Sequence, residues 1–446
     1  MSPHAVGRRH VQRSVAAGVP LALLAALVVA GTASAASPAQ PRVTHTATLG
    51  DLPLGTFSNA LLPGTVDNDR GVDLGGIGSD LYPAGRKGEF WTVTDRGPNG
   101  QIKVDGKKRR TFPVAGFDPA IVKIRVCGDT VTVLDAIPIT TSSGKPVTGL
   151  SNQAGRDEAP YSYDAQTPLA YNPNGLDTEG IVRAKDGSFW LVDEYGPSLI
   201  HVSARGKVLT RYVPKGLGLT GTDYPVVEAL PSVLLHRKTN RGLEGLAQLP
   251  DGDLVMALQS PLSLPDATAG DTSRTTRLLR FSPKKRAVTA EYAYRFDPVN
   301  VVDPSEDDPS ELKISSVVAV GRDRLLVEER TDKAAHLQTV RLTRSADILG
   351  GPFDSDTTSP SLEQLDDPAS AGVPVLGKRL VVDLGTVAGV PSKIEGVARV
   401  DHDTLALIND NDFGMTDGTG AFDPQGRLVD SGIETTVTYV RLPRGI

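Results

Sequence analysis

The chain has 446 residues and a formal net charge of −6. Its first 35 residues contain three arginines and no acidic residue, so the remainder carries 44 Lys and Arg against 53 Asp and Glu, a net charge of −9. This acidic balance argues against nucleic acid, or an anionic membrane, as the main partner. It suits a protein that binds cations, or one that holds an anionic substrate through a cation or local arginines.

The N-terminal segment has the pattern of a secretory signal peptide. Three arginines precede an apolar stretch from Val15 to Ala30, and Ala33-Ser34-Ala35 supplies the small residues of a cleavage site. The apolar stretch is shorter than the ~20 residues that span a bilayer, which disfavours an uncleaved anchor. Arg8-Arg9 leaves twin-arginine export open beside the general secretory route. We predict a signal peptide at 1–35 and a secreted, monomeric single domain at 36–446 that does not contact a membrane.

Composition predicts many short strands without disulfide support. Gly and Pro together number 79, and long apolar segments with a helical period are missing. Cys127 is the only cysteine, so no internal disulfide can form and the fold must rest on its core. Because Cys127 follows the apolar run 121–126, we expect a buried structural thiol.

A repeated unit runs along the chain. The clearest copy begins at Glu179-Gly180, turns at Asp186-Gly187 and continues through the apolar segment 189–194. Each unit is an apolar strand, a tight turn and a second apolar strand, which is a β-hairpin. We call the two residues at its start the E-G signature. Further copies begin at Glu244-Gly245, Glu395-Gly396, a degenerate Ser315-Ser316 and an early Gly75-Gly76.

The repeats predict an all-β fold, a β-propeller of four-stranded blades. Five repeats are visible, at intervals of 65 to 104 residues. Six blades remain the alternative, because the longest interval could contain one more, although 121–139 is more simply the outer hairpin of the first blade. The segments 43–49 and 435–442 are expected to pair and close the ring.

The second hairpin strand carries a polar residue fifteen positions after each signature glutamate. With a short turn between them, both residues should lie at the same end of the hairpin. The innermost strands line the channel of a propeller, so the three signature glutamates should converge at one mouth, with the second set one strand further out. The pairs are Glu179 and Glu194, Glu244 and Gln259, and Glu395 and Asp410, and Asp95 is the counterpart of Glu194 in the first unit.

Carboxylates that converge need protons or a cation to offset their charge. Clusters that offer only oxygen suit Ca²⁺, which accepts six to eight oxygen ligands. The alternative is that the glutamates satisfy backbone donors or pair with arginines such as Arg96, Arg241 and Arg330. Nucleophile chemistry is disfavoured, since the chain has no G-x-S-x-G elbow, no zinc-type histidine spacing, and no phosphate-binding or dinucleotide loop.

Five segments of the chain resemble the phytase-like family, which is often labelled "esterase-like activity of phytase". They are 94–99, 174–180, 193–198, 240–245 and 409–414, and the resemblance extends from about residue 48 to the end. It implies a secreted bacterial propeller, related in architecture to calcium-dependent phytases, that hydrolyses phosphate or other esters of small molecules. The catalytic residues of well-described propeller phytases do not map onto this chain motif for motif.

On this interpretation the reaction is metal-assisted hydrolysis with Ca²⁺ as cofactor. Glu179, Glu244 and Glu395 are the candidate catalytic residues, and Arg96 and Arg241 would hold the substrate phosphate in forked hydrogen bonds. The candidate metal ligands are Glu179, Glu194, Glu244, Glu395, Asp410 and Asp95. Two alternatives remain open: a non-catalytic secreted binding propeller with a structural cation, and a calcium-dependent lactonase.

Overall fold

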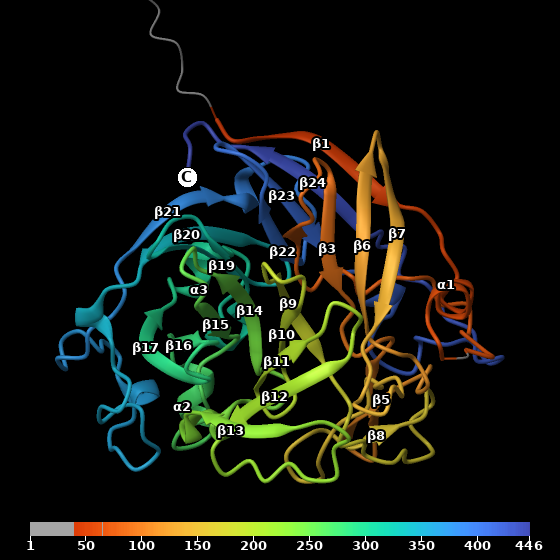
Figure 1. Ribbon diagram of the computed structural model, residues 1–446, viewed down its shortest axis with the longest axis horizontal. Coiled ribbons are helices and arrows are strands. Elements are labelled where there is room, and N and C mark those ends of the chain that lie inside the picture. Colours follow the sequence, from red (N-terminus) through yellow and green to blue (C-terminus); the bar gives the residue numbers. More distant parts are fainter. Residues whose placement is uncertain (1–39, 65) are drawn as a thin grey trace, which may run out of the picture. The chain divides into compact units, whose positions relative to one another are not determined.

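Antiparallel β-sheets dominate the computed structural model of the protein, which describes residues 40–64 and 66–446 (Figure 1). Residues 40–446 form one compact unit. The predicted signal peptide at 1–35 lies outside the described residues. Within the described part of the chain, every helix is too short or too polar to cross a membrane.

The largest sheet has eight strands and contains both ends of the described chain. One half is β2-β3-β6-β7 and the other is β1-β24-β23-β22, and a short parallel pairing of β1 with β7 joins them. The strands are β1 (Arg42–Leu49), β2 (Tyr82–Pro83), β3 (Glu89–Val93), β6 (Ala120–Cys127), β7 (Thr130–Pro138), β22 (Ile394–Arg399), β23 (Thr404–Asn409) and β24 (Thr436–Arg441).

Three further sheets follow the repeated units, and a small fourth one stands apart from them. The first three are ordered β13-β12-β11-β10-β9, β14-β15-β16-β17 and β18-β19-β20-β21. Their strands are β9 (Thr178–Arg183), β10 (Phe189–Asp193), β11 (Ser198–Val202), β12 (Val208–Pro214), β13 (Val226–Leu230), β14 (Leu243–Gln248), β15 (Leu254–Leu258), β16 (Thr275–Ser282), β17 (Ala287–Arg295), β18 (Lys313–Ala319), β19 (Arg324–Arg330), β20 (Ala335–Arg341) and β21 (Lys378–Asp383). The small sheet contains β4 (Gly100–Val104), β5 (Lys107–Thr111) and β8 (Pro160–Tyr161).

Helices are short and lie in the connections. The α-helices are α1 (Leu54–Leu61), α2 (Ala267–Thr272) and α3 (Val299–Val302). The 3-10 helices are η1 (Ser232–His236), η2 (Pro309–Glu311), η3 (Arg344–Ala346), η4 (Leu362–Gln364), η5 (Leu384–Thr386) and η6 (Asp412–Gly414).

The sheets have a propeller-like arrangement. Strands β9, β14, β18 and β22 end their sheets and pack one beside the next, and β2 contacts both β22 and β9 to complete the circuit. Strand β1 pairs antiparallel with β24, from Arg42 opposite Arg441 to Thr48 opposite Thr436. The expected pairing of the first and last strands is therefore confirmed, and it fastens the described ends together by main-chain hydrogen bonds.

Cys127 does not lie in the core. It is exposed, at the last position of β6 beside the turn to β7, where it faces Thr130 across the hairpin. The prediction of a buried thiol was wrong because full burial along β6 ends at Ile124: Arg125 is exposed and Val126 is only partly buried against the core.

The signature glycines allow the innermost strands to approach closely. A Cβ atom on Gly180 would lie 2.7 Å from the Glu244 carbonyl oxygen on the next innermost strand, and one on Gly245 would lie 2.7 Å from Val317 Cγ2. Real Cβ atoms do not reach these distances, so only glycine permits the spacing. The repeat therefore keeps glycine for packing between sheets.

We expect Gly180→Ala to lower the free energy of unfolding by about 1–3 kcal/mol, since the methyl group would overpack this contact. Chemical denaturation of the two proteins measures the change. Gly377→Ala is the matched control, because a Cβ atom there meets nothing within 4 Å. Equal losses in the two variants would contradict the packing role.

The strand register places the signature of the first repeated unit at a different position from the one predicted. Tyr82 lies opposite Trp91, just as Val182 lies opposite Trp190, so Ser79-Asp80 is the counterpart of Glu179-Gly180. Gly75-Gly76, the predicted counterpart, has another role: Gly76 has φ +52°, and its N–H donates to Asn411 Oδ1 at 3.2 Å. Close packing against Phe413 requires glycine at position 76.

Candidate functional site

All eight predicted site residues line one polar cavity of about 560 Å³ at one end of the innermost strands. Each of the three signature glutamates that line it is the second residue of an innermost strand (β9, β14 or β22), so the cavity lies at the N-terminal ends of these strands. Nine carboxylates and six cationic side chains line it, an excess of three negative charges. The predicted residues are Asp95, Arg96, Glu179, Glu194, Arg241, Glu244, Glu395 and Asp410.

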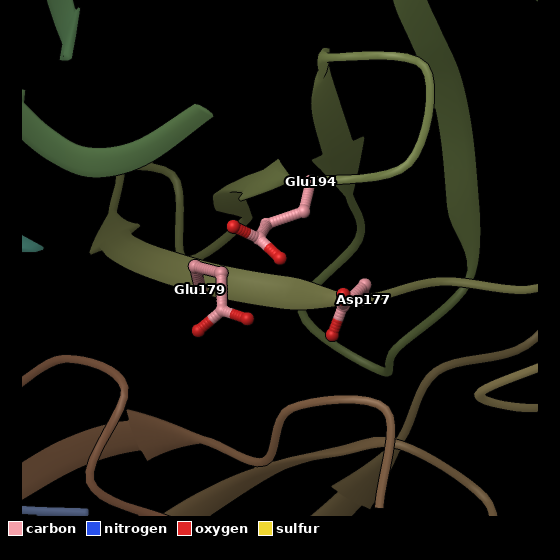
Figure 2. Close-up of side chains that lie close together, drawn as sticks. All are labelled: Asp177, Glu179 and Glu194. Carbon is pink, nitrogen blue, oxygen red and sulfur yellow. The ribbon is translucent and has the colours of Figure 1, made fainter. Parts of the chain in front are cut away.

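The three signature glutamates converge as expected. One oxygen from each of Glu179, Glu244 and Glu395 lies within 4.8 Å of the other two. A second group meets the same limit and consists of Asp177, Glu179 and Glu194, whose carboxylates gather beside β9 (Figure 2). Glu179 belongs to both groups and is the shared point of the cluster.

Arginines offset part of this charge. The Arg96 guanidinium pairs with Asp177 and, at 3.2 Å, with Glu194, and Arg330 pairs with Glu395. The expected alternative, pairing with arginines, therefore accounts for part of the cluster. It does not account for Glu179: among the described residues, its carboxylate makes neither a hydrogen bond nor an ion pair, although the residue is only 7% exposed.

Burial and crowding raise the affinity of the cluster for protons. Desolvation, and then the charge of Glu244, raise the pKa of Glu179 well above its usual range. Desolvation, and then the charge of Glu194, do the same to the pKa of Glu244. The pKa of Glu194 rises to about 7, chiefly through burial. At neutral pH the cluster must hold protons or a cation.

Asp410 differs from the other predicted ligands. Burial acts to raise the pKa of Asp410, but Lys393 Nζ, which donates to its Oδ2 at 2.7 Å, and the Asp412 N–H, which donates to its Oδ1 at 3.1 Å, together lower it. Asp410 and Asp95 both line the cavity but belong to neither compact oxygen group. The structure thus brings together four of the six predicted metal ligands closely and holds the other two at the wall.

The two arginines that were predicted to bind substrate differ in their exposure and in their partners. Arg96 is 5% exposed and is bound by Asp177, Glu194 and the Asn240 side chain. Arg241 is half-buried, and only its NH1 is engaged, by Ser260 Oγ at 3.0 Å and the Ser310 carbonyl oxygen at 3.1 Å. Arg96 NH1 is buried without a hydrogen-bond partner among the described residues, so Arg241 is the more accessible of the two to a ligand in the cavity.

Three residues of the site that were not predicted lie two positions before the signature. Asp177, Lys313 and Lys393 precede Glu179, Ser315 and Glu395 by two. Side chains two apart on a strand point to the same face, so this alternation could have identified them. Lys313 pairs with Asp332 at 3.0 Å and lines the cavity.

A hydrogen-bonded bridge crosses the ring beneath the cavity. Asp80 and Ser316 occupy the two signature positions that lack glycine, and Ser316 Oγ donates to Asp80 Oδ1 at 3.3 Å. Asp80 also accepts from the Ile181 N–H at 2.9 Å, and Ser316 accepts from the Val397 N–H at 3.2 Å. On the far side lies a separate cavity of about 270 Å³ with mainly apolar walls. The bridge lies between the two cavities.

Glu328, on β19, lies near this bridge. It is 1% exposed, and within the described part of the chain neither of its carboxylate oxygens has a hydrogen-bond partner. Burial raises the pKa of Glu328 to about 8, and the pKa of Asp80 to about 7. Both acids are thus protonated in the folded protein at pH values where an unfolded chain has lost the proton.

These shifts predict that stability falls as pH rises. Between the unfolded values near 4 and the folded values of about 7 and 8, the folded protein binds more protons than the unfolded chain. We expect the free energy of unfolding to decrease from about pH 5 to about pH 8. Urea unfolding of Glu328→Gln should show a shallower decline than wild type, whereas the exposed Glu228→Gln should match wild type. Parallel pH curves for all three would contradict the assignment.

The fold and the cavity define a mostly β, propeller-like protein with a carboxylate-rich site at one end of its innermost strands. The chain matches the family model "Phytase-like: Esterase-like activity of phytase" over residues 72–413, and it belongs to this family. It is also similar to an "Uncharacterized secreted protein" of Arthroderma benhamiae, with 24% identity over 342 residues, covering 66% of this chain and 67% of the relative.

Similarity to solved structures is weak. A luciferin-regenerating enzyme has 11% identity and a TM-score of 0.36, covering 84% of this chain and 95% of its own. The PQQ-bound aldose sugar dehydrogenase of Streptomyces coelicolor has 10% identity and a TM-score of 0.34, covering 90% and 98%. The calcium-binding protein regucalcin of Agrobacterium tumefaciens has 11% identity and a TM-score of 0.33, covering 83% and 90%. These values carry no conclusion about the activity of this chain.

Proposed function

We propose that this protein is a secreted hydrolase of phosphate esters or related esters, and that it works with a Ca²⁺ ion held at the Glu179 cluster. The observation that carries the proposal is Glu179 itself: a nearly buried carboxylate without a protein partner, shared by two groups of converging oxygens. We further propose that the sheets form five blades, the eight-stranded sheet contributing two.

The donor set suits calcium. Oxygen ligands bind Ca²⁺ at 2.3–2.6 Å, so oxygens on opposite sides of one ion are about 5 Å apart. The 4.8 Å limit within the group Glu179, Glu244 and Glu395 agrees with this span. In addition, Glu194 Oε1, Glu244 Oε2 and Gln259 Oε1 are buried without a hydrogen-bond partner among the described residues. Unsatisfied buried oxygens of this kind are costly unless a ligand engages them.

Different residues of the cavity would bind the cation and orient the substrate. A bound divalent cation would polarise a phosphoryl or carbonyl oxygen. Glu179, Glu244, Glu395 and Glu194 would hold it. Arg241 presents an unengaged side of its guanidinium to the same cavity and would orient the anionic oxygens of the substrate. Arg96, whose NH2 group pairs with both carboxylates, would keep Asp177 and Glu194 in place.

Phosphate release from a simple monoester and from phytate tests the proposal. We expect release with calcium present and its loss on chelation. Calcium should also protect the folded protein, by about 2.7 kcal/mol at a concentration 100 times its Kd. Protection without turnover of any ester would support the non-catalytic binding propeller instead. Turnover of lactones, with phosphate esters untouched, would support the lactonase.

A further inference from the structure

An exposed basic hairpin stands at the wall of the cavity. Strands β4 and β5 and their turn carry five basic residues and one acidic residue in twelve positions, on a chain that is otherwise acidic. The turn at Asp105-Gly106 has φ of +49° and +78° at its two central residues, which is the tight geometry of a two-residue hairpin. We call this hairpin, residues 100–111, the arm, and its two strands are joined by this tight turn.

The base of the hairpin is tied to the proposed site. Gln101 and Arg110 face each other across the two strands, and both line the cavity. Glu158 accepts a hydrogen bond from Gln101 Nε2 at 3.0 Å and from Arg110 Nε at 2.8 Å. The same carboxylate lies 3.9 Å from Arg96 NH1. Glu158 thus connects the arm to the arginine that orders the carboxylate cluster.

The hairpin continues the cavity wall outward with positive charge. Lys103 and Lys108 form the next directly opposed pair on the same face, because residues two apart on a strand share a face. This pair lies about 7 Å beyond Gln101 and Arg110, at 3.3–3.4 Å per residue. Both lysines are exposed, and neither has a carboxylate within 4.0 Å in residues 40–64 or 66–446.

Two lysines directly opposite each other weaken a hairpin, since like charges repel across the strands. No carboxylate among the described residues pairs with either lysine, whereas Arg110, in the next pair on the same face, is neutralised by Glu158. A multiply charged anion that lay along the face would offset both lysines at once. The repulsion between Lys103 and Lys108 would therefore be offset if the arm bound an anionic ligand that extends out of the cavity.

We propose that the β4–β5 hairpin binds a chain of phosphate groups, one end of which enters the cavity. The inference rests on the proposed function for the choice of phosphate as the anion. It goes beyond that function because it specifies an oligomeric substrate, too long for the cavity, and makes Lys103 and Lys108 its specificity determinants. Inorganic polyphosphate is the simplest ligand of this class.

Fluorescence anisotropy with end-labelled polyphosphate tests the arm in the mature chain. We expect Lys103→Gln/Lys108→Gln to weaken binding about five- to tenfold at low ionic strength, as two exposed ion pairs of ~0.5–0.7 kcal/mol each would give. The difference should shrink at high salt. Lys284→Gln/Lys285→Gln is the matched control, because it removes two adjacent exposed lysines at the turn between β16 and β17 and should bind as wild type.

Two binding results would overturn the proposal: equal binding by wild type and the hairpin variant, and equal competition by polyglutamate of matched charge. A melting temperature of the variant at or above that of wild type shows that folding is intact. Monoester hydrolysis, measured in parallel, should be the same in all three proteins. If none of the three hydrolyses the monoester, phytate or a related ester but the binding difference persists, the proposed function fails and the role of the arm stands.

Discussion

Replacing Glu179 with Gln is expected to abolish calcium protection and lower the proposed hydrolysis about 100-fold or more. Loss of a shared ligand removes several kcal/mol of charge stabilisation, and each 1.36 kcal/mol is a factor of ten in rate. The metal-free variant should nevertheless be more stable than wild type, by about 1 kcal/mol, because a buried carboxylate without a partner is lost. Calcium titration by calorimetry, turnover, and denaturation in chelator measure the three effects.

The variant should lose the stability that calcium gives but gain stability without calcium, so this experiment separates a cation ligand from a purely structural residue. A glutamate that served only the fold would destabilise the protein when replaced, with or without calcium. Glu228→Gln is the control, because Glu228 is an exposed residue of β13 and contributes to neither oxygen group. A metal-free Glu179→Gln protein that is less stable than wild type, with calcium affinity retained, would refute the cation site.

Arg96→Leu is expected to cost about 3–5 kcal/mol of unfolding free energy in chelator. The substitution leaves Asp177 and Glu194 buried without their cation, and breaking a buried ion pair from one side has a cost of this order. Calcium should recover more stability in this variant than in wild type, since the freed carboxylates attract it. Denaturation with and without calcium gives both numbers.

Arg109→Leu provides the comparison for Arg96. Arg109 is half-buried, lies over the Tyr161 ring, and donates to the Ala165 carbonyl oxygen at 2.7 Å, but has no carboxylate partner among the described residues. Its replacement should cost about 1 kcal/mol. If Arg96→Leu costs no more than this, the carboxylates around Arg96 do not depend on its charge.

The convergence of the signature glutamates was predictable from sequence because it depends only on local geometry. A strand, a short turn and a second strand fix which residues share an end, and repetition brings the ends together. The fifteen-residue spacing therefore placed Glu179 beside Glu194 without knowledge of the fold. The pairing of β1 with β24 followed in the same way, from two unpaired strands at the ends of a repeated array.

Sequence alone could not resolve features that depend on contacts between distant segments. Gly76 looked like a signature glycine, but its conformation serves the contact with Phe413, more than 300 residues away in sequence. The charge balance of the cavity was hidden for a related reason. Whether Arg330 or Arg96 neutralises a given carboxylate depends on where long side chains end, which periodicity does not determine.

The bridge of Asp80 and Ser316 has a consequence for kinetics. Because it lies between the two cavities, it would close the passage between them in the proposed hydrolase, and substrate and product would enter and leave on the polar side. A released anion would then leave past Arg241, which also lines this cavity. Orthophosphate should therefore be a competitive inhibitor, and an enzyme of this design would slow as its product accumulates in a confined medium and recover when the surroundings dilute it.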